Sequence, residues 1–442
     1  MKNEKFKNRK CVVFGMGNSG VSAFRLLHAL GGEVYAISQG EVDSWPCFEQ
    51  LMSLTSRNYL VCQDEVNQSL IEGVEFVVIS PGIPRDLPIF KFFQGIPVIS
   101  EIELGVRALD LDGPTYIGVT GTNGKTTTVS FLGEMIKDLN KEVFVGGNIG
   151  IPLCDYAYQR LFQKRASVDY ILLELSSFQL EASPSFHPKV SGILNVTPNH
   201  GERYLSENDY KQAKFNLFNN VTKTDTVILN AKLKTNFSSG AKIVYVEENS
   251  EFNYPYSLEN FKLVGEHNLF NLKFCLEVLK GLDLMLPEVQ RTIDHFSGVA
   301  HRLQYVESED AFTLYNDAKS TNWEATITAL KAFEGQRGLY LILGGKKRGR
   351  GDSISPYIET ISNYVEKIML IGETENDLGL ELEGYIPYEK CGNLNTVFLR
   401  LRADEFKGTV LFSPAFPSFD QFKNYMERGE SFISEAQKPS IR

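Results

Sequence analysis

Three short apolar runs, each followed by a glycine-rich turn, constrain the fold of this chain most strongly. They lie at residues 11–17, 116–121 and 339–345. A strand buried on both faces of a parallel sheet reads as a continuous apolar run, and glycine permits a tight turn at its carboxyl end. Apolar residues at three- and four-residue spacing follow at 21–30 and 127–139, which is typical of helices. Alternating strands and helices predict α/β domains with largely parallel sheets.

The chain length and two turn-rich stretches predict how the chain divides. At roughly 150 residues per domain, 442 residues give about three domains. A turn-rich stretch at 111–114 precedes the second apolar run, and Phe-Ser-Gly at 296–298 precedes a new strand pattern. We therefore expect domains at 1–110, 111–297 and 298–442.

The charge balance and the cysteines exclude several classes of protein. Lys plus Arg number 45 and Asp plus Glu number 55, so the formal net charge is −10, which argues against a nucleic-acid binder. Six scattered cysteines without C-x-x-C spacing indicate neither a disulfide scaffold nor a zinc ribbon. No apolar run approaches the roughly 20 residues that span a bilayer, and the first residues do not resemble a signal peptide. We expect a cytoplasmic protein with no nucleic-acid or membrane partner.

The segment at 118–127 predicts a phosphate-binding loop, because an apolar strand enters it and a helical pattern leaves it. Backbone N–H groups in such a loop surround phosphate oxygens, and the helix N-terminus adds a favourable dipole. Lys125 would reach the terminal phosphates, and the Thr126 hydroxyl would bind Mg²⁺. Val119 stands where the full motif has glycine, so an incidental turn is the alternative.

Gly-Met-Gly-Asn-Ser-Gly at 15–20 fits a dinucleotide-binding turn between a strand and a helix. Such a site needs an acidic residue at the end of the next strand to hold a ribose. That strand ends instead in Ser38 and Gln39, which weakens an NAD-dependent oxidoreductase as an interpretation. Another diphosphate ligand, or a tight turn with no ligand, remains open.

Polar residues follow the later strands of the second and third units. Glu174 and His200 each come just after an apolar strand, and either could bind Mg²⁺ or serve only the structure. Lys214, from patterning alone, resembles a solvated lysine on a helix surface. In the third unit, Arg302 and Lys319 could hold phosphate or carboxylate oxygens, or form surface ion pairs.

Taken together, the motifs, in this order and spacing, resemble the Mur ligase family, and within it the members that add D-glutamate. The resemblance covers 15–428 and rests on the segments at 121–126, 146–150, 174–181, 316–322 and 418–425. It implies an α/β protein with an N-terminal Rossmann-like domain for the UDP end, a central P-loop ATPase-type parallel sheet, and a C-terminal Rossmann-like domain for the amino acid. The implied reaction is ATP-dependent joining of D-glutamate to UDP-N-acetylmuramoyl-L-alanine through an acyl phosphate, by a monomer.

The resemblance also implies residue roles. ATP would be held by Gly121, Thr122, Asn123, Gly124, Lys125, Thr126, Thr127, Asn268, Asn271 and Arg302. Two Mg²⁺ ions would be bound by Thr126, Glu174, His200 and Lys214, the last as a carbamate, which reverses its interpretation as a surface lysine. The catalytic set would be Lys125, His200, Lys214, Asp317 and Lys319, with His301 beside them. The UDP-sugar would meet Asn18, Ser19, Ser80, Asn148, Ser176 and Phe178, and D-glutamate would meet Thr321, Arg348, Ser418 and Tyr425.

The sequence leaves other functions open. A related ligase of the same fold, such as a folylpolyglutamate synthase or a Mur ligase for another amino acid, would share the ATP site. The absence of an Asp-Asn-Pro-Arg motif and the segment at 418–425 argue against it. A P-loop nucleotide-binding protein without ligase activity would hydrolyse ATP regardless of amino acids.

Overall fold

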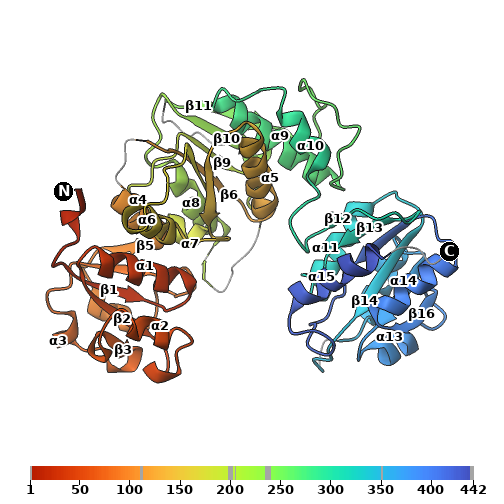
Figure 1. Cartoon of the computed structure of the whole chain (residues 1–442), viewed down its shortest axis with the longest axis horizontal. Helices are drawn as coiled ribbons and strands as arrows, with labels where there is room; N and C mark the ends of the chain where they lie inside the picture. Colours follow the sequence, from red (N-terminus) through yellow and green to blue (C-terminus); the bar gives the residue numbers. More distant parts are fainter. Residues whose placement is uncertain are drawn as a thin grey trace. The chain divides into compact units, whose positions relative to one another are not determined.

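The computed structural model describes residues 2–109, 113–197, 203–204, 206–233, 240–349 and 352–438 (Figure 1). The chain forms two compact units. The first consists of Met1–Ser250 with Asn271–Val289, and the second of Glu251–Phe270 with Gln290–Arg442. Two of the three β-sheets belong to the first unit and the third to the second unit.

The first sheet is parallel, with strand order β3-β2-β1-β4-β5. Its strands are β1 Lys10–Phe14, β2 Glu33–Ser38, β3 Leu60–Cys62, β4 Phe76–Ile79 and β5 Val98–Ser100. Its helices are α1 Asn18–Ala29, α2 Phe48–Met52, α3 Gln68–Ile71 and α4 Glu101–Leu109. The order reverses beside β1, so the glycine-rich turn after β1 lies at the switch point where parallel sheets bind ligands.

The second sheet is also parallel, with strand order β11-β10-β9-β6-β8-β7. Its strands are β6 Thr115–Thr120, β7 Val143–Gly147, β8 Tyr170–Glu174, β9 Val190–Ile193, β10 Thr226–Asn230 and β11 Lys242–Val246. The helices beside this sheet in the chain are α5 Lys125–Asp138, α6 Leu153–Phe162, α7 Ser177–Leu180 and α8 Glu207–Phe215. Helix α9 Glu266–Gly281 begins in the second unit and continues into the first, and α10 Val289–His295 belongs to the second unit from its second residue on. The expected phosphate loop joins the central strand β6 to α5.

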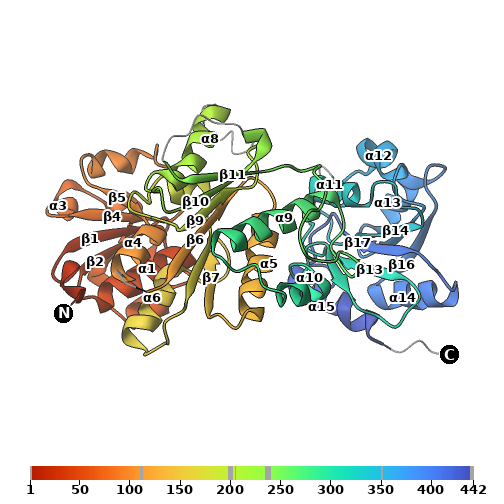
Figure 2. The same ribbon diagram turned by 90° about the horizontal axis from the view of Figure 1, so that it is seen from above.

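One apolar core runs through both sheets of the first unit. Helices α1, α4 and α6 pack together where the two sheets meet, as both views show (Figures 1 and 2). A Cβ atom at Gly105 of α4 would lie 2.7 Å from the side chain of Leu153 on α6, so only glycine permits this approach.

The third sheet is mixed, with strand order β12-β13-β17-β14-β15-β16 and only β12 antiparallel among the described strands. Its strands are β12 Gln304–Val306, β13 Thr313–Asn316, β14 Leu339–Gly344, β15 Lys367–Ile371, β16 Tyr388–Gly392 and β17 Thr409–Phe412. Its helices are α11 Trp323–Leu330, α12 Ile358–Ser362, α13 Glu375–Leu382, α14 Leu394–Ala403 and α15 Tyr425–Ala436. Along β14, Leu341 and Leu343 enter one core and Ile342 another, so both faces are buried.

These sheets confirm the predicted α/β fold. The domain boundaries near 110 and 297 stay predictions. Among the described residues, no helix is both long enough and apolar enough to cross a membrane.

Candidate functional site

The loop between β6 and α5 is shaped by a side chain that sequence reasoning missed. Asn195 follows β9, and its Oδ1 accepts hydrogen bonds from the backbone N–H groups of Thr122 (3.0 Å) and Asn123 (2.9 Å). Its position just past the carboxyl end of a strand was the available signal. A side chain just past the neighbouring strand therefore helps to hold the loop in place.

The loop turns at Gly124, whose φ of +79° strongly favours glycine. A Cβ atom there would lie 2.8 Å from Oδ1 of Asn271, so this predicted ATP residue lies directly against the loop. The ammonium of Lys125 donates to the carbonyl oxygens of Gly121 (2.9 Å) and Thr122 (2.8 Å). A cation thus lies over the turn, where it would stabilise the negative charge of bound phosphate oxygens.

Lys214 is buried, so its interpretation as a solvated surface lysine was wrong. Its amine donates to the carbonyl oxygen of Gly121 at 2.9 Å and lies 4.6 Å from the centre of the Tyr210 ring. Burial, with the nearby charge of Lys125, lowers the pKa of Lys214 to about 7, although Glu174 opposes the shift. A substantial fraction of the Lys214 amine is therefore unprotonated near neutral pH.

Glu174 ends β8 and is buried, and its two carboxylate oxygens differ in their hydrogen bonding. Its Oε1 accepts from the side-chain amide of Asn148 at 2.9 Å, and its carbonyl oxygen accepts from the Asn148 N–H at 2.8 Å. Its Oε2 is buried and has no hydrogen-bond partner among the residues that the structure describes. A buried oxygen of this kind is costly unless a cation or another donor satisfies it.

The other predicted metal ligands are less fully defined. Thr126 lies in the first turn of α5, beside the loop. His200 lies outside the described residues, as does Asn199 before it. Within the described ranges, no group of three or more His, Cys, Asp or Glu side chains could hold a metal ion.

Two of the residues expected to meet the muramoyl group, Ser176 and Phe178, lie at the N-cap of α7 and within it. Ser176 caps this helix, its Oγ accepting from the N–H of Gln179 at 3.2 Å. The guanidinium carbon of Arg203 lies 3.9 Å from the centre of the Phe178 ring. Arg203 also donates to the carbonyl oxygen of Pro81 at 3.2 Å, which ties the second sheet to the first. Sequence reasoning missed this arginine as a contact of Phe178.

The glycine turn after β1 is supported by two serines. Ser80 donates from Oγ to the carbonyl oxygen of Gly15 at 2.6 Å. The N–H of Met16 donates to Oγ of Ser38 at 3.4 Å, so the residue that replaces the ribose-binding acid contacts the turn itself. Ser19 lies in the first turn of α1.

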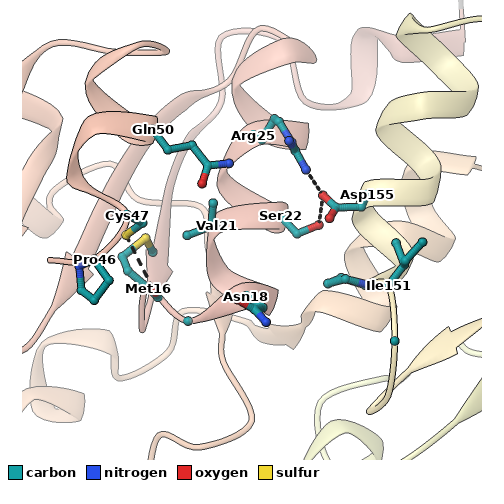
Figure 3. Close-up of a pocket in the computed structure, with 13 residues that line it drawn as sticks. Met16, Asn18, Val21, Ser22, Arg25, Pro46, Cys47, Gln50, Ile151 and Asp155 are labelled. Carbon is teal, nitrogen blue, oxygen red and sulfur yellow. Dashed lines mark hydrogen bonds and ion pairs between the residues drawn. The ribbon is translucent and has the colours of Figure 1, made fainter. Parts of the chain in front are cut away.

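A pocket of about 600 Å³ opens beside this turn, between α1, the 46–50 segment and the start of α6 (Figure 3). Its polar side chains are those of Asn18, Ser22, Arg25, Gln50 and Asp155. Asp155 accepts from the hydroxyl of Ser22 at 2.6 Å and pairs with Arg25, so α1 and α6 are joined along one wall (Figure 3).

In the second unit, the predicted residues gather at the carboxyl edge of the third sheet. Asp317 follows β13 and is buried, accepting from the N–H of Leu303 (3.2 Å) and the hydroxyl of Ser413 (2.7 Å). Burial raises the pKa of Asp317 to about 6, against the opposing effect of its hydrogen bonds. The amine of Lys319 lies 5.4 Å from the centre of the Tyr425 ring.

The basic loop after β14 is tied to its surroundings by its own charges. Arg348 donates to the carbonyl oxygen of Thr321 at 2.8 Å and pairs with Asp352 at 3.1 Å. Lys346 and Lys347 pair with carboxylates of Glu373 and Asp377, each at 2.7 Å. Each of these cations thus has a carboxylate partner, which an incoming anion would have to replace or share.

Sequence reasoning also missed the role of Arg428 on α15. This side chain is buried and donates to the carbonyl oxygens of Phe416 (2.8 Å) and Ala318 (2.9 Å). It therefore joins the loop that carries Asp317 to the loop that leads to the buried Ser418.

The predicted residues therefore fall into two groups. The first unit holds Asn18, Ser19, Ser80, Gly121, Thr122, Asn123, Gly124, Lys125, Thr126, Thr127, Asn148, Glu174, Ser176, Phe178, Lys214 and Asn271. The second holds Asn268, His301, Arg302, Asp317, Lys319, Thr321, Arg348, Ser418 and Tyr425.

Known proteins similar to this chain agree with one another. Residues 119–255 match the model of the Mur ligase middle domain. A UDP-N-acetylmuramoylalanine--D-glutamate ligase of Thermoanaerobacter pseudethanolicus is 32% identical, covering 96% of this chain and 97% of the relative. A ligase of the same name from Geotalea daltonii is 33% identical, with 96% of each chain covered. Another from Macrococcus caseolyticus is 32% identical, with 98% of each chain covered.

Solved structures share the fold at low identity. MurF ligase from Thermotoga maritima in complex with ADP superposes with a TM-score of 0.56 at 14% identity, covering 98% of this chain and 97% of that chain. UDP-N-acetylmuramate-alanine ligase MurC from Thermotoga maritima has a TM-score of 0.52 at 17% identity, covering 96% and 98%.

Proposed function

Because the chain belongs to the Mur ligase family, we propose that it joins D-glutamate to UDP-N-acetylmuramoyl-L-alanine with consumption of ATP, in the synthesis of peptidoglycan precursors. The observation that carries this proposal is similarity to ligases of one name over 96% of the chain. That similarity includes the third sheet, where the resemblance places the amino acid, as well as the ATP-binding part that all such ligases share.

The chemistry explains why a phosphate loop is needed. A carboxylate is a poor electrophile, so its oxygen first attacks the γ-phosphorus of ATP, giving an acyl phosphate and ADP. The amine of D-glutamate then attacks the acyl carbon, and phosphate leaves from the tetrahedral intermediate. Lys125, lying over the loop, would offset the charge that gathers on the transferred phosphoryl group.

The buried carboxylate of Glu174, on the strand next to β6, fits a divalent cation. Mg²⁺, when bound, would neutralise phosphate charge. Glu174 is its best-supported ligand, because Oε2 is buried and no described residue donates to it. Thr126, His200 and a carbamate on Lys214 would complete the ligands of two such ions.

A carbamate on Lys214 agrees with its surroundings. It would form when the neutral amine attacks CO₂, a new N–C bond forms and one proton is released. The lowered pKa of Lys214 supports the neutral amine, and the resulting anion would suit a cation where an ammonium would repel it.

We assign the UDP-sugar to the pocket beside the glycine turn and the adjoining loops. The turn and the N-terminus of α1 would receive the diphosphate, with Asn18 and Ser19 at that end and Ser80 holding the turn. Asn148, Ser176 and Phe178 would meet the muramoyl part.

D-Glutamate is assigned to the edge of the third sheet, with Thr321, Arg348, Ser418 and Tyr425. Nearby, His301, Arg302, Asp317 and Lys319 would serve ATP and the acyl phosphate, while Asn268 and Asn271 would serve the adenine. The amine must lose a proton before it attacks, and His200, Asp317 or solvent would accept it.

Phosphate release tests the proposal. The chain, ATP, Mg²⁺ and UDP-N-acetylmuramoyl-L-alanine are mixed with one amino acid at a time. We expect release to depend on D-glutamate and not on L-glutamate, L-lysine or meso-diaminopimelate. Release that ignores the added amino acid would indicate a nucleotide-binding protein without ligase activity, and dependence on another amino acid would indicate a related ligase.

A further inference from the structure

Glu101 is a buried carboxylate that the proposed reaction does not use. It begins α4, is 1% exposed, and its Oε1 accepts the N–H of Cys154 at 2.5 Å. Cys154 lies in the first turn of α6, whose own N-cap, Pro152, makes no side-chain cap. The N–H groups at a helix start lack partners within the helix and attract negative charge. Glu101 thus caps α6 from another helix.

The start of α6 is also held from α1. Asp155, one residue after Cys154, contacts Ser22 and Arg25 along the wall of the pocket (Figure 3). The second oxygen of Glu101, Oε2, is buried, with no hydrogen-bond partner within the described part of the chain. Burial raises the pKa of Glu101 to about 7, the Asp155 carboxylate adds to the shift, and the N–H of Cys154 opposes it.

The segment that ends at this capped turn carries Asn148. Residues 147–152 lead from β7 to α6, and Ile151 and Pro152 line the pocket. Asn148 contacts Glu174 through both its side chain and its backbone. The segment is therefore fixed at one end by Glu174 and at the other by the cap on α6.

We propose that Glu101 is a positioning residue for the UDP-sugar: by capping α6 it sets segment 147–152, and through that segment the side chain of Asn148. The inference rests on the proposed function, because that function gives this segment a substrate to meet. It predicts that loss of the cap weakens binding of the UDP-sugar and leaves binding of D-glutamate unchanged.

Glu103 provides a matched control on the same helix. It is also fully buried, but it accepts from the backbone and hydroxyl of Ser185 and pairs with Arg107, away from segment 147–152. Glu101→Ala and Glu103→Ala each remove a buried carboxylate from α4. Both should lower the melting temperature, so stability alone does not separate them.

The test compares KM values from D-glutamate-dependent phosphate release. Glu101→Ala should raise KM for UDP-N-acetylmuramoyl-L-alanine by about fivefold or more, with KM for D-glutamate unchanged. The size follows from the loss of a helix cap, which shifts the equilibrium between an ordered and a disordered helix start by about tenfold. Glu103→Ala should change neither KM. Equal effects of the two variants on the UDP-sugar KM would overturn the inference.

If Glu101→Ala does not fold, Glu101→Gln decides, since it keeps the acceptor and cannot ionise. The wild-type KM for the UDP-sugar should rise between pH 8 and pH 6, as the cap loses its charge beside Cys154 and Asp155, and Glu101→Gln should lack this part of the pH dependence. Identical pH dependence would contradict the inference. If the wild type shows no D-glutamate-dependent phosphate release, the proposed function itself is wrong.

Discussion

At the scale of a residue, Lys214 offers the sharpest test of the ATP site. Its amine lies 2.9 Å from the carbonyl oxygen of Gly121, inside the proposed nucleotide loop. We expect Lys214→Ala to lower kcat by about 100-fold or more, the size of effect seen when a group that stabilises transition-state charge is removed. Acetate or formate should restore part of the activity, because a small carboxylate can occupy the place of a carbamate.

Lys211 on the same helix is the control, since its amine lies over the Phe215 ring at 5.5 Å and has no place in the proposed reaction. Lys211→Ala should keep its activity and show no response to acetate. Loss of activity in Lys214→Ala without any recovery in carboxylates would count against the carbamate.

The position of Lys214 also shows what sequence patterns miss at this scale. Tyr210, Ala213 and Lys214 share one buried helix face at spacings of three and four, but a pattern based on apolar residues assigns a lysine to the solvent side. The pairing of Asn148 with Glu174 joins residues 26 apart in sequence, so only the fold reveals it. The resemblance to known motifs, rather than periodicity, predicted Lys214 and Asn148 as site residues, whereas the place of Glu174 at the end of a strand had already made it a candidate.

At the scale of an element, the cap on α6 should make stability depend on pH. The pKa of Glu101 is raised from 4.5 to about 7, so the folded chain binds this proton more tightly than the unfolded chain. Stability from this group is complete below about pH 4.5 and is lost as pH rises towards 7, by at most about 3 kcal/mol. Glu101→Gln cannot ionise and escapes this loss.

We therefore expect the unfolding free energy of Glu101→Gln, relative to wild type, to increase between pH 5 and pH 8. Urea denaturation at both pH values measures it. If the difference in unfolding free energy between the two proteins is the same at pH 5 and pH 8, the pKa of Glu101 is not raised by folding, and this prediction is wrong.

The elements themselves were largely predictable. The runs at 11–17, 116–121 and 339–345 each contain a central buried strand, because a strand covered on both faces must be apolar along its length. Tertiary contacts between these elements were not predictable, since the cap by Glu101 and the ties made by Asn195, Arg203 and Arg428 depend on which loops the fold brings together.

At the scale of the whole molecule, net charge and local charge make opposite predictions. The chain carries −10, and each proposed substrate is an anion. If the overall field governed binding, added salt would screen a repulsion and lower KM. If the local cations govern it, added salt would screen an attraction and raise KM.

We expect the local cations to dominate for ATP and the UDP-sugar. Lys125 lies over the proposed phosphate loop, and the N-termini of α1 and α5 follow the two turns that we propose bind phosphates. KM for both should rise when ionic strength increases from about 0.05 to about 0.5 M, over which the screening length falls from roughly 14 to 4 Å. D-Glutamate should respond less, because Lys346, Lys347 and Arg348 already pair with carboxylates. Initial rates at fixed free Mg²⁺ measure this, with sucrose as an uncharged control, and a fall in KM for ATP would show that net charge governs binding.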